Sequence, residues 1–371
     1  MIASPKFASD LPLCNQVLAR SLATCLPAVS RSRRSGGEAG LISRVLVIGS
    51  GYHRQILGGI ESPLSSWSEL LRCVAETHGI HNEAICYAHP TETWERFVVA
   101  HSARRGGKAA AKSELELKKT AASVLKDAFS KHSAKYAEDG MHRSLADYLG
   151  KGGIHLISLN FDDASYRAML KKASGRGRVK TPESRRLARG LRKADEQLLF
   201  RRIIIQAENG AASFVWHPHG RCDRPGSLRL GLRDYGVMPA CYFRAFAEFK
   251  AWERAILGKR SRKDQPMGPA DHRILLDALA EMDAGAPGQR RWRADTWVTR
   301  FMLLPVTFIG VGLSAHEIGL RWLLAQRARN LARVTVANDA LIVTADRCVP
   351  LGAADIGLEG WDAAWAYALK L

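Results

Sequence analysis

The chain has 371 residues, of which 46% are hydrophobic and 25% are charged, an ordinary globular composition that supports a large core. No run reaches the ~18 apolar residues that a membrane span needs, so we expect no membrane contact. The seven cysteines are scattered and form no CxxC pair. This pattern excludes the common zinc-ribbon spacings and argues against a secreted disulfide framework, so a reducing cytoplasm fits best.

The formal net charge is +19, and much of it lies in the runs Arg31–Arg34, Lys171–Lys193 and Lys259–Lys263. Such a charge attracts polyanions and anionic metabolites. No aromatic residues interleave with the basic residues of Lys171–Lys193, which weakens the case for a surface that stacks nucleic-acid bases. A large dinucleotide or an acidic protein partner would explain the charge as well.

The first part of the chain predicts an arm followed by alternating strands and helices. Residues 1–41 are rich in Ser, Ala, Leu and Arg, and we favour a flexible, partner-docking arm over a targeting sequence. Two β-branched apolar runs predict buried strands, and two amphipathic or Ala/Lys/Glu-rich stretches predict helices. In chain order these are Arg44–Ile48 (strand), Trp67–Glu76 (helix), Gly107–Asp139 (mostly helix) and Ile154–Leu159 (strand).

The second part continues the alternation after Lys171–Lys193, which we predict to be an insertion that becomes helical near Glu183. Short apolar runs predict further strands, and spaced apolar residues predict further helices. In chain order these are Ser213–Trp216 (strand), Cys241–Leu257 and Asp271–Met282 (helices), Pro305–Gly310 (strand), a helix through Arg327, and strands at Arg333–Val336 and Leu341–Thr344.

This alternation predicts an α/β fold with a Rossmann-like parallel sheet that has helices on both faces. Residues 42–371 would form one domain, with helical insertions at about 84–150 and 236–300. Ligands of such sheets bind beyond the carboxyl ends of the strands. Polar and glycine residues follow four of the predicted strands, namely Gly49–Gly51, Asn160–Asp162, His219–Gly220 and Gly310–Ser314, so we expect them to converge.

The glycine turn Gly49-Ser50-Gly51 would let the backbone approach a pyrophosphate and direct N–H groups at it. The third glycine of a GxGxxG motif is missing, and Arg54 stands in its place. A simple tight turn explains the same residues equally well.

Asn160 and His219 are the candidates for chemistry. The uncharged amide of Asn160, at a strand end, can hold a ribose hydroxyl or a water, although an Asx-turn would also use it. His219 can act as a general base near pH 7, while His217 and His219 together could instead be a metal pair. A zinc site needs further ligands, and the sequence offers no second cluster, so no metal is expected.

The succession VLVIGSG, SLNFDD, HPHG with LGLRDYG, and FIGVGLSAHEIGLRWLL resembles that of sirtuin-like domains in bacterial antiphage defence proteins, over roughly residues 42–345. The resemblance implies that Asn160 and His219 are the catalytic pair. It also implies that NAD is held by Gly49, Ser50, Gly51, Asp162, Gly310, Gly312 and Ser314. The four-cysteine zinc lobe of protein-deacylating sirtuins is absent from the sequence.

The resemblance therefore implies an NAD hydrolase that releases nicotinamide and ADP-ribose and depletes NAD in infected cells. The alternatives are a protein deacylase or ADP-ribosyltransferase, a silent nucleotide-sensing assembly module, and a basic nucleic-acid-binding protein. Because NAD depletion harms the cell, we expect control through a homo-oligomer or a partner defence protein. That partner could be an ATPase, an Argonaute-like protein or a nucleotide-processing protein, and nucleic acid could bind through it.

Overall fold

The computed structural model describes residues 43–80, 89–107, 110–161, 178–180, 196–207, 211–260, 265–284, 293–311, 317–334, 340–343 and 353–355. The first predicted strand is the centre of the fold. It forms β1 (Arg44–Ile48), in which Val45 and Val47 face one apolar core while Leu46 and Ile48 face another. A strand that is apolar on both faces is typical of a parallel sheet covered on both sides.

The described strands make one eight-stranded sheet in the order β3-β4-β5-β2-β1-β6-β7-β8. The strands beside β1 are β2 (Ile154–Ser158) and β6 (Val306–Ile309), and both run parallel to it. The others are β3 (Arg178–Lys180), β4 (Arg202–Gln206), β5 (Ala212–Trp216), β7 (Ala340–Val343) and β8 (Ala353–Asp355).

The strands from β5 to β8 are all parallel, in the order β5-β2-β1-β6-β7-β8. Numbered along the chain, they have the order 3-2-1-4-5-6 of the doubly wound dinucleotide-binding fold. The order reverses between β1 and β6, which is where such sheets bind ligands. The predicted Rossmann-like α/β sheet is present in this part of the molecule.

The edge beyond β5 differs from the all-parallel prediction. β4 pairs antiparallel with β5, and β3 pairs antiparallel with β4. The connection from Gln206 to Ala212 is short, and only antiparallel neighbours can be joined by such a short turn. The run Arg202–Gln206 (RIIIQ) carries a clear strand signal that we did not assign.

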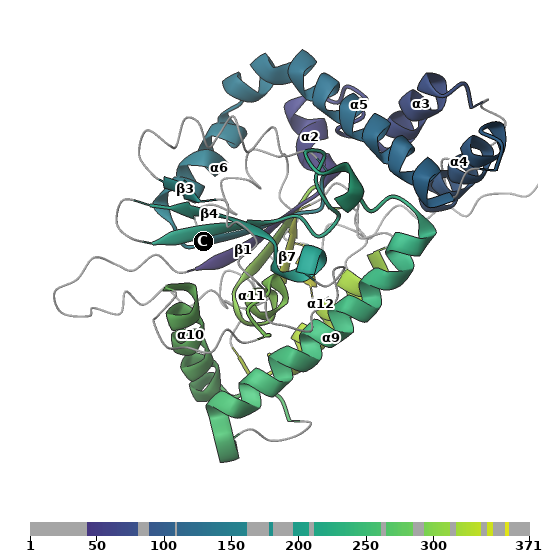
Figure 1. Cartoon of the computed structure of the whole chain (residues 1–371). Helices are drawn as coiled ribbons and strands as arrows, with labels where there is room; N and C mark the ends of the chain where they lie inside the picture. The colour runs from purple at the N-terminus through teal and green to yellow at the C-terminus, as the bar shows by residue number, and fades with distance from the viewer. Residues whose placement is uncertain are drawn as a thin grey trace, which may run out of the picture.

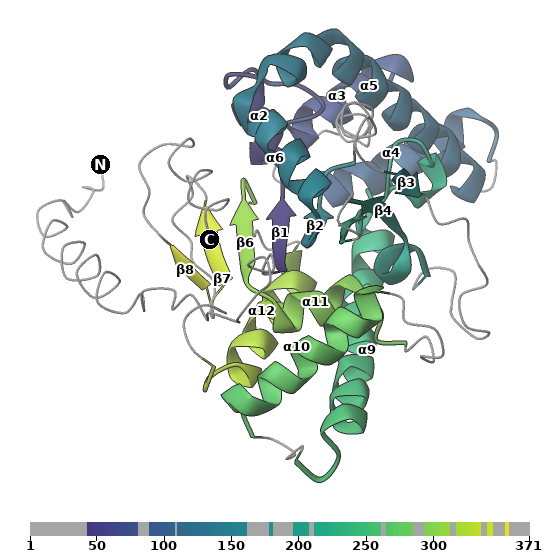
Figure 2. The ribbon, with the colours of Figure 1, turned by 90° about the vertical axis from the view of Figure 1, so that its left-hand side faces the viewer.

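Helices cover both faces of the sheet (Figures 1 and 2). One layer, above the sheet in Figure 2, follows β1 in the chain. It contains α2 (Ser50–Ile56), α3 (Trp67–Thr77), α4 (Pro90–Arg104), α5 (Ala110–Glu138) and α6 (Gly140–Lys151). Their apolar side chains pack on Leu46 and Ile48 in one continuous core.

The second layer, below the sheet in Figure 2, packs on Val45 and Val47. It contains α9 (Leu232–Leu257), α10 (Pro269–Ala284), α11 (Trp297–Leu303) and α12 (Ile318–Asn330). Short helical turns lie at Glu196–Phe200, Pro225–Ser227 and Gly258–Arg260. None of the helices in the described ranges is both long and apolar enough to cross a membrane.

Most predicted elements are found close to their predicted bounds. The helices predicted at Trp67–Glu76 and Asp271–Met282 are α3 and α10, while α9 begins nine residues before the predicted Cys241. The strand predicted from Arg333 is wrong at its start, because Arg333 and Val334 lie in a turn after α12. The arm at 1–41 and most of Lys171–Lys193 lie outside the described residues.

Candidate functional site

A pocket of about 260 Å³ lies at the reversal of strand order, beyond the carboxyl ends of β1, β2, β5 and β6. All four predicted strand-end segments contribute residues to it, as do helices of both layers. Its lining comprises Gly49, Ser50, Pro63, Leu64, Ser66, Trp67, Leu70, Pro90, Leu125, Leu159, Asn160, Phe161, His219, Tyr235, Gly310, Val311 and Glu317. The convergence expected for Asn160, His219, Gly49, Ser50 and Gly310 is therefore present in the structure.

Three glycines join the end of β1 to the end of β6. A Cβ on Gly49 would lie 2.6 Å from the Gly310 carbonyl oxygen, and one on Gly51 would lie 2.7 Å from Gly310 Cα. Gly310 has a φ of +61°, and a Cβ there would lie 2.5 Å from the Tyr52 nitrogen. Only glycine fits at these positions, because the backbones themselves are in contact.

The same junction uses the glycine N–H groups that we expected to face a pyrophosphate. Gly49 donates to the carbonyl of Ile309 at 3.1 Å, and Gly51 donates to that of Gly310 at 3.0 Å. Neither N–H group is directed at a ligand. Phosphate binding at this turn would therefore depend on Ser50, which is exposed and lines the pocket.

Asn160 follows β2 and is fixed against the turn after β1. Its side chain is buried, and Nδ2 donates to the carbonyl oxygen of Gly49 at 3.0 Å. Its backbone N–H donates to the hydroxyl of Ser158 at 3.3 Å. An amide carries two donors and an acceptor, so this anchor holds the group in place while Oδ1 can accept a bond from a ligand.

His219 is held by a tight turn after β5. Gly220 has a φ of +91°, and a Cβ there would lie 2.1 Å from the carbonyl oxygen of Ser227. Arg229 donates its backbone N–H to the His219 carbonyl at 2.9 Å, closing the segment back on itself. The turn directs His219 into the pocket, whereas the neighbouring His217 is buried and does not line it.

The imidazole of His219 lies between a phenol and a carboxylate. Its Nδ1 is 3.5 Å from the hydroxyl of Tyr235, and its Nε2 is 3.6 Å from a carboxylate oxygen of Glu317. Within the described part of the chain, Nε2 is buried without a hydrogen-bond partner. Burial, followed by the negative charge of Glu317, raises the pKa of Tyr235 well above its ordinary value, so this phenol stays neutral.

Four rings stand next to one another around the pocket: Trp67, Phe161, His219 and Tyr235. The ring centroids of Trp67 and Phe161 are 5.6 Å apart, and those of Phe161 and His219 are 6.3 Å apart. The circuit closes through Tyr235, whose centroid is 5.5 Å from that of His219 and 5.9 Å from that of Trp67. We call this arrangement the aromatic box.

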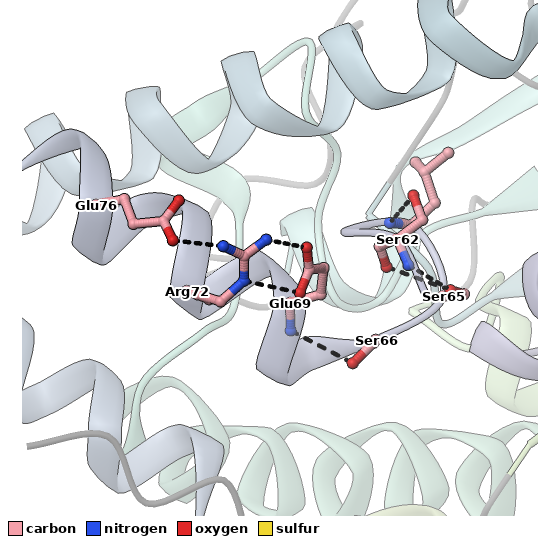
Figure 3. Close-up of polar contacts among 7 residues, drawn as sticks. Ser62, Ser65, Ser66, Glu69, Arg72 and Glu76 are labelled. Carbon is pink, nitrogen blue, oxygen red and sulfur yellow. Dashed lines mark hydrogen bonds and ion pairs between the residues drawn. The ribbon is translucent and has the colours of Figure 1, made fainter. Parts of the chain in front are cut away.

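The start of α3 fixes the position of Trp67. The hydroxyl of Ser66 accepts a hydrogen bond from the backbone N–H of Glu69 at 3.3 Å and so caps the helix just before Trp67 (Figure 3). Arg72 then bonds to Glu69 and Glu76 along the exposed side of the helix. Trp67 is therefore the first residue of α3, and the cap by Ser66 limits the movement of this end of the helix.

Other predicted site residues lie outside the described residues, namely Asp162, Gly312 and Ser314. Trp67, Tyr235 and Glu317 were missed as site residues, although Tyr235 and Glu317 lie within the LGLRDYG and LSAHE segments singled out in the sequence. In the ranges that the structure covers, no group of three or more His, Cys, Asp or Glu residues is placed to hold a metal ion.

The fold and the pocket define a mixed α/β protein with a ligand site at the reversal point of a mostly parallel sheet. No protein-family model matches the chain, and no curated protein sequence matches it.

Proposed function

We propose that the chain is an NAD hydrolase that cleaves the bond between nicotinamide and ribose. One observation carries the proposal: Asn160 and His219 converge on one pocket at the reversal point of a 3-2-1-4-5-6 sheet. An uncharged amide and an imidazole, brought together there from different strands, suit the activation of a hydroxyl or a water beside a ribose.

In the proposed reaction, His219 takes a proton from the attacking water as the water oxygen bonds to the anomeric carbon. The bond from that carbon to the pyridinium nitrogen breaks, and its electron pair leaves with neutral nicotinamide. The products are ADP-ribose, nicotinamide and one proton. Asn160 would orient the water or a ribose hydroxyl through its side-chain amide, which its bond to Gly49 holds in place.

The size of the pocket supports placing only one end of the substrate in it. Its volume of about 260 Å³ is smaller than the roughly 300–1,000 Å³ typical of sites for drug-sized ligands. We therefore assign the nicotinamide and its ribose to the pocket, and the adenylate half to the surface beyond Ser50 and Gly310. The net charge of +19 would favour the approach of an anionic dinucleotide.

We also propose that this activity serves antiphage defence in the cytoplasm and is controlled by assembly. The isolated chain should be nearly inactive and should turn on in a homo-oligomer or with a partner defence protein. Turnover should then depend on protein concentration and on added partner or nucleic acid. Full activity in a dilute monomer, insensitive to all of these, would exclude control by assembly.

The direct test measures nicotinamide release from NAD by the full chain, with and without proteins encoded beside it. Asn160→Ala and His219→Ala should each reduce turnover by ~100- to 10,000-fold with little change in melting temperature. His132→Ala, on α5 and away from the pocket lining, is the matched control and should keep full activity. Near-normal turnover by either site variant would overturn the catalytic assignment, and acyl-lysine removal without NAD hydrolysis would favour the deacylase.

A further inference from the structure

The charge of the pocket is opposite to that of the molecule. The chain carries a net charge of +19, yet no Lys or Arg is present among the lining residues, all of which belong to the described ranges. The one lining residue with a formal charge is Glu317, whose side chain is only 14% exposed. A purely anionic ligand would find no cation in this lining, so the pocket favours a ligand group of another kind.

The rings beside Glu317 also favour a cation. Trp67, Phe161 and Tyr235 all line this pocket, and Trp67 contacts the other two rings, with ring centroids 5.6 Å apart for Phe161 and 5.9 Å apart for Tyr235. A cation attracts the face of an aromatic ring within about 6 Å of its centroid, most strongly for tryptophan. Aromatic boxes of this kind recognise organic cations that cannot donate hydrogen bonds.

From the aromatic box and Glu317 together, we infer that this pocket binds a pyridinium cation and selects it over the uncharged form of the same ring. Apolar side chains, among them Leu64, Leu70 and Leu125, complete the wall and suit contact with the carbon atoms of such a ring. His219 closes the fourth side of the box and is almost fully buried, with Nε2 toward Glu317.

The cation-binding inference stands on the box itself, whereas its link to NAD rests on the proposed function. The nicotinamide ring of NAD is a pyridinium before cleavage, and it is neutral both after cleavage and in the reduced cofactor. The box would therefore hold the oxidised substrate and release the product. Glu317, as the anion nearest the ring, would also stabilise the positive charge that develops on the ribose as the bond breaks.

The test uses the full chain and three small probes: the 1-methylnicotinamide cation, neutral nicotinamide, and choline. Calorimetric titration should give about tenfold tighter binding of 1-methylnicotinamide than of nicotinamide. Glu317→Gln and Trp67→Leu should each remove most of that preference, measured as the ratio of the two dissociation constants. No step of this measurement requires NAD cleavage.

Two matched controls are present in the chain. Glu248 lies 3.6 Å from Arg293, the same separation as between Glu317 and His219, but on the surface, so Glu248→Gln should leave the preference intact. Trp322 packs edge-on against Phe243 at 4.3 Å outside the pocket, so Trp322→Leu should do the same.

The outcomes separate this inference from the proposed function. A preference for 1-methylnicotinamide that depends on Glu317 and Trp67 supports the pyridinium site even if NAD is not cleaved. Equal binding of the charged and neutral rings, or no measurable binding of either, overturns it even if NAD is cleaved. Choline that binds as tightly as 1-methylnicotinamide would assign the box to quaternary ammonium groups and overturn the assignment to pyridinium.

Discussion

Replacement of Arg300 should destabilise the fold more than any surface change. Arg300, on α11, is completely buried and pairs with Asp283 and, at 2.7 Å, with Asp295. Its guanidinium also lies 5.7 Å from the centre of the Trp216 ring. Arg300→Met keeps much of the apolar contact but leaves two carboxylates short of their cation.

The expected loss in the free energy of unfolding follows from this arrangement of buried charges. Removing one member of a buried ion pair typically costs 3–5 kcal/mol, because a charge is left without its partner. Some compensation remains, since Arg202 still bonds to Asp295 at 2.7 Å and His155 still lies 3.3 Å from Asp283. We therefore expect a loss of about 3 kcal/mol at pH 7, a large part of a typical stability of roughly 5–15 kcal/mol.

The loss in the free energy of unfolding should become smaller as the pH falls. Burial alone would raise the pKa of Asp283, but Arg300 and then His155 outweigh it and hold that pKa well below its ordinary value. The carboxylate therefore stabilises the wild type above the unfolded pKa of about 3.9, and this contribution is lost as the pH falls below it. In the variant the folded pKa rises, so the difference between the two proteins should shrink between pH 7 and pH 4.

Urea denaturation followed by circular dichroism at pH 7.0 and 4.5 measures both the loss of stability and its change with pH. Arg293→Met is the control, because Arg293 is half exposed and its pair with Glu248, at 3.6 Å, should contribute about 0–1 kcal/mol. A loss below about 1 kcal/mol for Arg300→Met at pH 7 would contradict the reasoning. A difference in the free energy of unfolding between the wild type and Arg300→Met that grows as the pH falls would also contradict it.

Three further predictions concern the site and its supports. Gly220→Ala should abolish the proposed NAD cleavage and lower the melting temperature, because the new Cβ meets the Ser227 carbonyl; a stable and active variant would disprove the role of this turn. Lys118→Met should cost about 3 kcal/mol in urea, because Lys118 and Arg229 hold the pKa of buried Asp234 low against the opposing effect of burial; an unchanged midpoint would contradict this. Treatment with a chelator should leave the melting temperature unchanged, since the seven cysteines form no CxxC pair of the kind that binds zinc, and a loss of stability with stoichiometric zinc would refute it.

The sequence predicted the strand-end residues well because that prediction depends on local pattern. A run such as Val45–Ile48 is apolar on both faces, so it must lie inside a sheet, and the residues directly after it must lie at the sheet edge. Asn160 and His219 were found in this way. The antiparallel position of β4 was missed although the run RIIIQ was visible, since the pattern of a strand does not state its direction.

The aromatic box could not be predicted in the same way. The four rings come from separate parts of the chain, and Trp67, Phe161 and Tyr235 each have the pattern of an ordinary core residue. Their adjacency depends on how α3 and α9 pack at the end of the sheet, which is a property of tertiary structure. Glu317 was hidden for the same reason, because nothing near it in the sequence points to His219.

The contact among Gly49, Gly51 and Gly310 has a consequence for the evolution of this chain. Each glycine is required by the backbone of another, so relatives that keep the sheet must keep these glycines whether or not they bind a nucleotide. Their retention among descendants would therefore report only that the β1–β6 junction has been preserved. Divergence of function should instead appear at His219 and Glu317, which line the pocket and where no close backbone contact requires one residue type.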